Sequence, residues 1–316
     1  MKKITVFNTA ICSENIGDYI IMDSVNYEIY NLFYNEMIFE TLTHDVISKP
    51  SYRLNKISDF SFIGGTNLLS SKMNKYNQWK IGFIDAFFLK DILLLGVGWW
   101  QYQTTPNLYT KRILQKVLNK KMLHSVRDSY TEKMLKSIGI KNVINTGCPT
   151  MWELTEEHCN NIPQKKADSA VFTLTDYNKD IDCDQLLINI LASNYSTLYF
   201  WPQGSGDYDY LKSLNNTGTI IILGANLNSF NKLLDDQSKN IDYIGTRLHA
   251  GIRSIQKFRR SIIIGIDNRA VEKRKDFNLK VLLRNNLTEL DNEINRNFKT
   301  EISLHTKNIE IWRSQF

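Results

Sequence analysis

The sequence is poor in features that mark secreted, metal-binding and membrane-spanning proteins. It contains only four cysteines and five prolines in 316 residues. The cysteines, at positions 12, 148, 159 and 183, lack the close paired spacing of zinc sites and redox dithiols, so we expect reduced thiols and no metal site. The longest apolar run, residues 92–100, is far shorter than the ~20 residues that span a bilayer. It predicts a buried strand.

We expect no targeting signal at the N-terminus. Its apolar run, residues 4–7, is shorter than the roughly 7 to 15 residues of a signal-peptide core. The sequence also lacks low-complexity tracts, internal repeats and nucleic-acid-binding motifs. We therefore expect a cytoplasmic protein that does not act on nucleic acid.

The composition is that of a globular protein with two domains. Hydrophobic residues make up 42% and charged residues 23%, and the chain exceeds the roughly 250 to 300 residues at which one core stops growing. A polar stretch, Glu153 to Asp168, predicts a boundary between domains 1–155 and 168–316. The net charge of +6 favours phosphorylated ligands or anionic membrane surfaces.

Short apolar runs alternate with segments of helical period, which is typical of parallel sheets flanked by helices. The pattern predicts an α/β fold of two Rossmann-like domains facing a cleft, with a C-terminal helical tail. A helix is expected over 21–33, and Ser129 with Glu132 predicts a capping box for another. The expected strands are 4–7, 60–63, 92–97, near 125–126, 170–174, 198–201, 219–223, 243–244, 262–266 and 281–283.

Ligands of open α/β sheets bind beyond the carboxyl ends of strands, near helix N-termini. Two glycine-containing segments have this placement: Asn15-Ile16-Gly17-Asp18 and Gly64-Gly65-Thr66-Asn67. In the first, Gly17 permits close backbone approach and Asp18 is expected to cap a helix. Taken alone, tight turns are the plainer explanation of both segments, and ligand sites are the alternative.

The strongest candidate is the segment Ile244 to Arg253, a strand that runs into a helix. Arg247 would lie at the strand end with a fork of donors suited to carboxylate or phosphate. His249 titrates near neutral pH and can transfer a proton. A structural histidine remains the alternative. Thr246 and Leu248 complete the motif.

Two further strand ends carry candidate groups. Arg127, in Ser125-Val126-Arg127-Asp128, is placed to bind an anion, and a surface ion pair with Asp128 is the alternative. Gln203, in Trp201-Pro202-Gln203-Gly204, is placed to bind a sugar through its amide, whereas the aromatic residue is more commonly part of a core.

In their order along nearly the whole chain, these segments resemble the polysaccharide pyruvyl transferase family. The matching residues are Asn15-Ile16-Gly17-Asp18, Gly64-Gly65, Gly96-Val97-Gly98, Ser125-Val126-Arg127-Asp128, Gly147-Cys148-Pro149, Trp201-Pro202-Gln203 and Thr246-Arg247-Leu248-His249-Ala250-Gly251. The chain departs at Gly64-Gly65-Thr66, where many members have a third glycine.

The resemblance implies a GT-B-like arrangement and transfer of a pyruvyl group from phosphoenolpyruvate to a sugar as a ketal. It implies that Arg247 and His249 are catalytic, and that Asn268 and Arg269, which follow a later strand, join the substrate site. The expected substrate-binding residues are Asn15, Gly17, Asp18, Gly65, Arg127, Gln203, Thr246, Leu248, Asn268 and Arg269. A solvated charged loop is the alternative for Arg269.

The expected partners are phosphoenolpyruvate and a sugar acceptor of capsule, exopolysaccharide or lipopolysaccharide synthesis, carried on a lipid or a nucleotide. No cofactor is expected, and peripheral contact with the inner membrane face follows from a lipid-linked acceptor. Two other functions remain open from sequence: a GT-B glycosyltransferase that uses a nucleotide sugar, because fold does not fix function, and a non-catalytic sugar-phosphate sensor.

Overall fold

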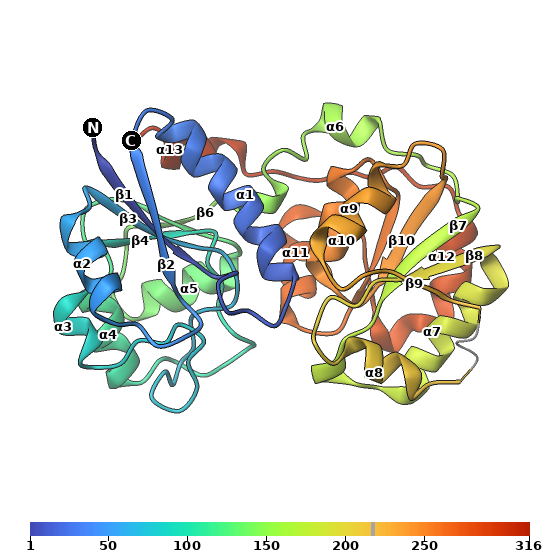
Figure 1. Ribbon diagram of the computed structural model, residues 1–316, viewed down its shortest axis with the longest axis horizontal. Coiled ribbons are helices and arrows are strands. Elements are labelled where there is room, and N and C mark those ends of the chain that lie inside the picture. The colour runs from blue at the N-terminus through green and yellow to red at the C-terminus, as the bar shows by residue number, and fades with distance from the viewer. Residues whose placement is uncertain (216–218) are drawn as a thin grey trace. The chain divides into compact units, whose positions relative to one another are not determined.

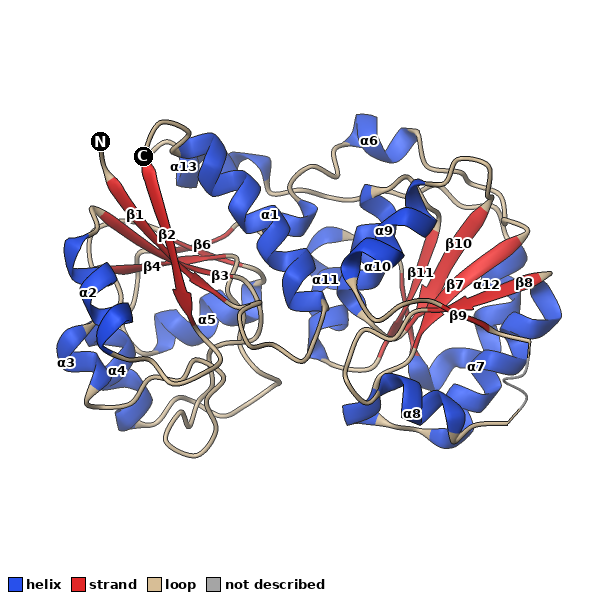
Figure 2. Ribbon diagram, in the orientation of Figure 1, coloured by secondary structure: helices blue, strands red, loops and turns tan. Residues whose placement is uncertain are grey.

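The computed structural model describes residues 1–215 and 219–316, and the chain forms two compact units. Unit 1 comprises residues 1–13, 21–152 and 304–316, and unit 2 comprises residues 14–20 and 153–303. The predicted fold class is confirmed, because each unit is a parallel sheet flanked by helices (Figures 1 and 2). Two segments differ from the division predicted at 155 and 168. Residues 14–20 belong to unit 2 and the C-terminal tail to unit 1.

Unit 1 is a parallel sheet in the order β2-β1-β3-β4, continued by the pair β5-β6. An isolated bridge links Val97, two residues after β4, to Val126 of β5. The strands are β1 (Lys3–Asn8), β2 (Met37–Leu42), β3 (Phe60–Gly64), β4 (Ile92–Leu95), β5 (His124–Val126) and β6 (Val143–Asn145). The helices are α1 (Gly17–Leu32), whose first residues lie in unit 2, α2 (Lys49–Ile57), α3 (Asp85–Phe88), α4 (Leu108–Val117), α5 (Ser129–Ser137) and α13 (Thr306–Arg313).

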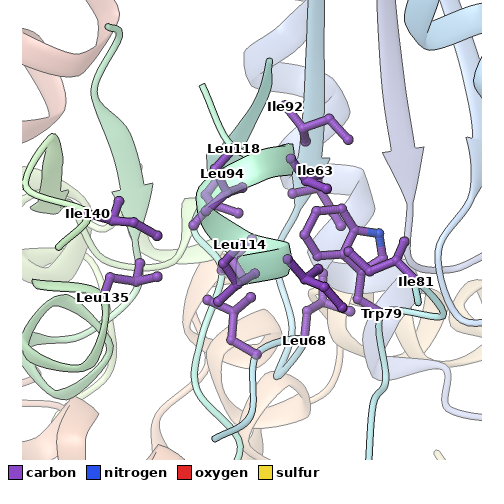
Figure 3. Packing of buried hydrophobic residues seen from close by; sticks show 14 of the residues in the cluster. Ile63, Leu68, Trp79, Ile81, Ile92, Leu94, Leu114, Leu118, Leu135 and Ile140 are labelled. Carbon is purple, nitrogen blue, oxygen red and sulfur yellow. The ribbon is translucent and has the colours of Figure 1, made fainter. Parts of the chain in front are cut away.

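The core of unit 1 has two halves, one on each side of the sheet. One half is a single cluster of apolar side chains from β3, β4, α4 and α5 that also contains Trp79 (Figure 3). The other half packs α1 and the tail helix α13 on the opposite face, with Trp312 fully buried. The tail therefore belongs to unit 1 because α13 completes its core.

Unit 2 is a six-stranded parallel sheet in the order β12-β11-β10-β7-β8-β9. The strands are β7 (Ser169–Thr173), β8 (Thr197–Phe200), β9 (Ile221–Ile222), β10 (Ile241–Gly245), β11 (Ser261–Gly265) and β12 (Val281–Leu283). The helices are α6 (Glu156–Asn160), α7 (Ile181–Asn194), α8 (Asp207–Lys212), α9 (Leu227–Asp235), α10 (Leu248–Gln256), α11 (Asn268–Phe277) and α12 (Leu290–Asn295). The strand order reverses between β7 and β10, and such a switch point is where Rossmann-like sheets bind ligands.

Two predicted helix caps are wrong. Asp128, not Ser129, caps α5, because its carboxylate accepts a hydrogen bond from the Thr131 N–H at 2.7 Å. Asp18 lies inside the first turn of α1, and the Asn15 side chain accepts from the Gly17 N–H at the start of the helix. In both cases the acceptor lies one or more residues before the predicted cap.

Candidate functional site

The best-defined cluster of candidate residues lies in unit 2, at the carboxyl ends of β7, β8 and β10. These three strands are neighbours in the sheet, so the loops that follow them are brought together at the switch point. Arg247 follows β10, Gln203 follows β8, and Asp176 follows β7.

Arg247 is the centre of this cluster. It is 3% exposed, and its Nε donates to the Leu174 carbonyl and to Asp207, each at 3.0 Å. Its Nη2 donates to Asp176 at 2.9 Å and also to Asp207. Within the described residues, none of these hydrogen bonds uses Nη1. The bound donors fix the plane of the guanidinium.

Two carboxylates form ion pairs with Arg247, and sequence analysis missed both. Asp207, at the start of α8, is fully buried and accepts from the N–H groups of Gln203 and Gly204 at 3.1 and 2.7 Å. Asp176 is partly exposed. Burial lowers the pKa of the Arg247 guanidinium, but Asp207, Tyr177 and Asp176 outweigh that effect and raise it above its usual value. Arg247 therefore stays charged.

The absence of a side chain at Gly204 leaves space for the Arg247 guanidinium. A Cβ atom at this position would lie 2.2 Å from Arg247 Nη2, closer than side chains approach. The glycine of Trp201-Pro202-Gln203-Gly204 thus makes room for the guanidinium that the later motif supplies.

The N-terminal motif joins the same cluster. Gln203 Nε2 donates to Asn15 Oδ1 at 2.8 Å, and the Ile16 N–H donates to the Gln203 carbonyl at 2.8 Å. Gly17 lets the amide approach, because a Cβ there would lie 2.6 Å from Gln203 Nε2. Within the described part of the chain, the buried Gln203 Oε1 has no hydrogen-bond partner. It is an acceptor suited to a ligand hydroxyl or amide.

Tyr177 contacts both Arg247 and Arg269, which lies after β11. Sequence analysis did not identify Tyr177 as a site residue. Its ring lies 4.9 Å from the Arg247 guanidinium, and its hydroxyl accepts from Arg269 Nη2 at 2.5 Å. Arg269, near the start of α11, is held by Asp267 through Nε at 2.7 Å. Sequence could have shown Asp176-Tyr177 and Asp207 as polar residues after strand ends, but not which cation they contact.

The other predicted residues of unit 2 lie in the segments that follow β10 and β11 and at the start of α1. His249 is buried in the first turn of α10, after Leu248, and Thr246 shares a hydroxyl contact of 2.8 Å with Thr175. Asn268 is the first residue of α11, and its buried Oδ1 has no hydrogen-bond partner within residues 1–215 and 219–316. Asp18 is buried at the start of α1.

Gly65 and Arg127 lie in unit 1, also beyond strand ends. Arg127 is 2% exposed, and it donates to Asp128 at 3.2 Å through Nε and to Asn67 through Nη2. A Cβ atom at Gly98 would lie 2.0 Å from Arg127 Nε. Arg127 therefore also packs against a glycine of one of the motifs. Asn67 was not among the predicted site residues, although it ends the segment Gly64-Gly65-Thr66-Asn67.

Two negative findings apply to the described residues. None of their helices combines the length and the apolarity that crossing a bilayer requires. No group of three or more histidine, cysteine, aspartate or glutamate side chains among residues 1–215 and 219–316 is placed to hold a metal ion.

Of the comparisons with known proteins, one identifies a family. None of the curated protein sequences matches the chain significantly. A solved structure with some similarity is the crystal structure of UDP-GlcNAc 2-epimerase from Neisseria meningitidis bound to UDP-GlcNAc, with 13% identity, a TM-score of 0.45 and coverage of 95% of each chain. That similarity is too distant to bear on function. The family model for polysaccharide pyruvyl transferase matches residues 15–268, and the chain therefore belongs to the polysaccharide pyruvyl transferase family.

Proposed function

We propose that this protein transfers the pyruvyl group of phosphoenolpyruvate to two hydroxyls of one sugar in a surface polysaccharide or its precursor, forming a ketal. The observation that carries the proposal is the Arg247 cluster. A buried, permanently charged guanidinium is held by two carboxylates at a sheet switch point, through bonds that leave its Nη1 unused.

In the proposed reaction, a proton is added to the methylene carbon of the donor and leaves a cationic centre at the adjacent carbon. One sugar hydroxyl attacks this centre and loses its proton. A second hydroxyl attacks as the bond from that carbon to the phosphate oxygen breaks. Two carbon–oxygen bonds form and one breaks. Of the two hydroxyl protons, one balances the proton on the new methyl group and the other leaves with phosphate.

Two side chains receive roles in this scheme. Arg247 binds the carboxylate or phosphate of the donor through Nη1, because a planar guanidinium matches such oxyanions. His249, two residues later in the first turn of α10, moves the proton as general acid or base. The scheme uses no cofactor besides the donor, so the rate should be unchanged by a chelator.

The test is incubation of the purified protein with phosphoenolpyruvate and a panel of sugar acceptors, following phosphate release and the mass gain of a pyruvyl ketal. Both signals together support the proposal. A melting temperature raised by a nucleotide diphosphate but not by phosphoenolpyruvate would favour the glycosyltransferase alternative. Tight binding of phosphoenolpyruvate without turnover on any acceptor would favour the sensor.

Arg260→Lys is a matched control for Arg247→Lys. Arg260 is also buried and paired with an aspartate, Asp242, at 2.6 Å, but it lies at the amino-terminal edge of the same sheet. Both variants exchange the guanidinium fork for a point charge. We expect loss of turnover only in Arg247→Lys, and equal losses in both would contradict the assigned role.

A further inference from the structure

Unit 1 carries a short segment whose apolar side chains point both inward and outward. In residues 80–90, Ile81, Ala86 and Leu89 are buried in the core, and Figure 3 shows Ile81 beside Trp79. Four large apolar side chains of the same segment are more than half exposed: Phe83 at 53%, Ile84 at 72%, Phe87 at 62% and Phe88 at 56%. We refer to these four residues as the α3 patch. Contiguous exposed apolar surface of this kind marks an interaction site.

The α3 patch is held in place by its neighbours. Asp85 accepts a hydrogen bond from the Gly82 N–H at 2.6 Å and another from the Tyr52 hydroxyl. The Tyr52 ring stacks on Phe88 at 4.9 Å, and Phe83 packs edge-on against Phe87 at 5.4 Å. The apolar side chains are therefore ordered without being covered, so little conformational entropy is lost when a partner covers them.

Basic side chains flank the patch on both sides. Lys116 of α4 lies 3.4 Å from the ring centre of Phe87, and α2 meets the patch through the stacking of Tyr52 on Phe88. Figure 1 shows α2, α3 and α4 together in unit 1. The sequences of α2 and α4 each contain three basic residues and no acidic residue: Lys49, Arg53 and Lys56, and Lys111, Arg112 and Lys116. In α4, exposed Leu108 precedes Arg112 and Lys116 at intervals of four residues, on one helix face.

We propose that the α3 patch binds the surface of a bilayer that contains anionic lipids. Aromatic and aliphatic side chains at the centre of the surface would enter the boundary between headgroups and acyl chains, and the basic helices would contact lipid phosphates. The charge pattern opposes pairing with a second copy. In a two-fold dimer, this surface would face itself and bring like charges together.

The test is flotation of the full chain with vesicles of phosphatidylcholine alone and with added phosphatidylglycerol. We expect binding to the anionic vesicles and weakening of that binding at high salt, because salt screens the basic contacts. Ile84→Ser combined with Phe87→Ser should weaken binding at least about tenfold, since it removes two large apolar groups. Tyr30→Ser combined with Tyr34→Ser is the matched control. It removes two exposed aromatic residues, one in the last turn of α1 and one just after that helix, and should leave binding unchanged.

Three results would overturn the proposal. The first is the absence of flotation with anionic vesicles, and the second is flotation unaffected by the Ile84 and Phe87 pair of substitutions. The third is a doubled mass in light scattering that the same substitutions abolish, which would assign the patch to a second copy of the chain. Flotation is measured without turnover, so its outcome is independent of the proposed pyruvyl transfer.

Discussion

Each unit buries an arginine beyond the carboxyl ends of its parallel strands, and the two are stabilised differently. Arg127 of unit 1 and Arg247 of unit 2 are both almost fully buried, and each packs against a glycine of one of the motifs. The carboxylate next to Arg127 is its sequence neighbour Asp128, which also caps α5. Arg247 instead contacts Asp207 and Asp176, forty and seventy-one residues away in sequence. The position of Arg247 therefore depends on tertiary contacts with carboxylates that are distant in sequence.

The residues that follow the two arginines also differ. Arg127 is followed by Asp128 and Ser129, and Arg247 by Leu248 and His249. The second sequence brings a histidine into the first turn of α10, whereas the first turn of α5 holds Glu132. The proposed proton transfer therefore depends on His249 of unit 2, and substitutions in both units test it.

The largest effect is expected for His249→Gln. General acid–base catalysis is typically worth roughly 10²- to 10⁴-fold, so kcat for ketal formation should fall by that factor with little change in melting temperature. The matched variant Ser129→Ala alters the corresponding position in unit 1 and should retain turnover. A melting temperature that collapses together with kcat would make His249 a structural histidine.

The next largest effect is on the pH dependence of stability, through His124 of unit 1. Burial lowers the pKa of His124 to about 4; its Nδ1 accepts from the Leu94 N–H at 3.2 Å, and its Nε2 lies 2.8 Å from the Asn119 carbonyl. The folded-state pKa lies below the ~6.5 of an unfolded histidine. The neutral His124 side chain therefore stabilises the folded state above about pH 6.5. As the pH falls toward 4, the free energy of unfolding decreases by about 3 kcal/mol because of this group.

Urea unfolding at several pH values measures this loss. His124→Gln should flatten the pH dependence in that window, because the titrating group is gone. His249→Gln is the comparison variant, and a pH slope that persists in His124→Gln would assign the acid sensitivity to other groups.

A smaller effect is expected for Arg247→Lys. Hydrogen bonds to charged groups contribute about 1.5 to 3 kcal/mol, so kcat/KM for phosphoenolpyruvate should fall by roughly 10- to 150-fold. Arg127→Lys in unit 1 tests the role predicted for that arginine from the family resemblance. Unchanged kinetics in Arg127→Lys, beside a loss in Arg247→Lys, would restrict donor binding to unit 2.

The smallest effect is expected at Tyr177. Its ring contributes a cation–π contact to Arg247, worth about 0.5 to 1 kcal/mol at an exposed position. Tyr177→Ala should therefore raise KM for phosphoenolpyruvate about two- to fivefold, and Tyr177→Phe should restore most of the loss because it keeps the ring. If Tyr177→Phe were as impaired as Tyr177→Ala, the hydroxyl contact with Arg269 would be the part that matters.

The sequence by itself determined the α/β class, most of the strands and the local arrangement around Arg247 and His249. These features depend on apolar periodicity and on residues a few positions apart, which local sequence records. The family resemblance followed from the order of these motifs, and the family match over residues 15–268 confirmed it.

Tertiary structure alone decided which groups from distant segments meet. It placed residues 14–20 in unit 2 beside Gln203, put the tail helix α13 into the core of unit 1, and brought Asp207, Asp176 and Tyr177 to Arg247. The physical reason is that strand order in a parallel sheet differs from chain order. The loops that meet at one sheet edge are therefore set by strand pairing over long separations, and no local pattern encodes that pairing.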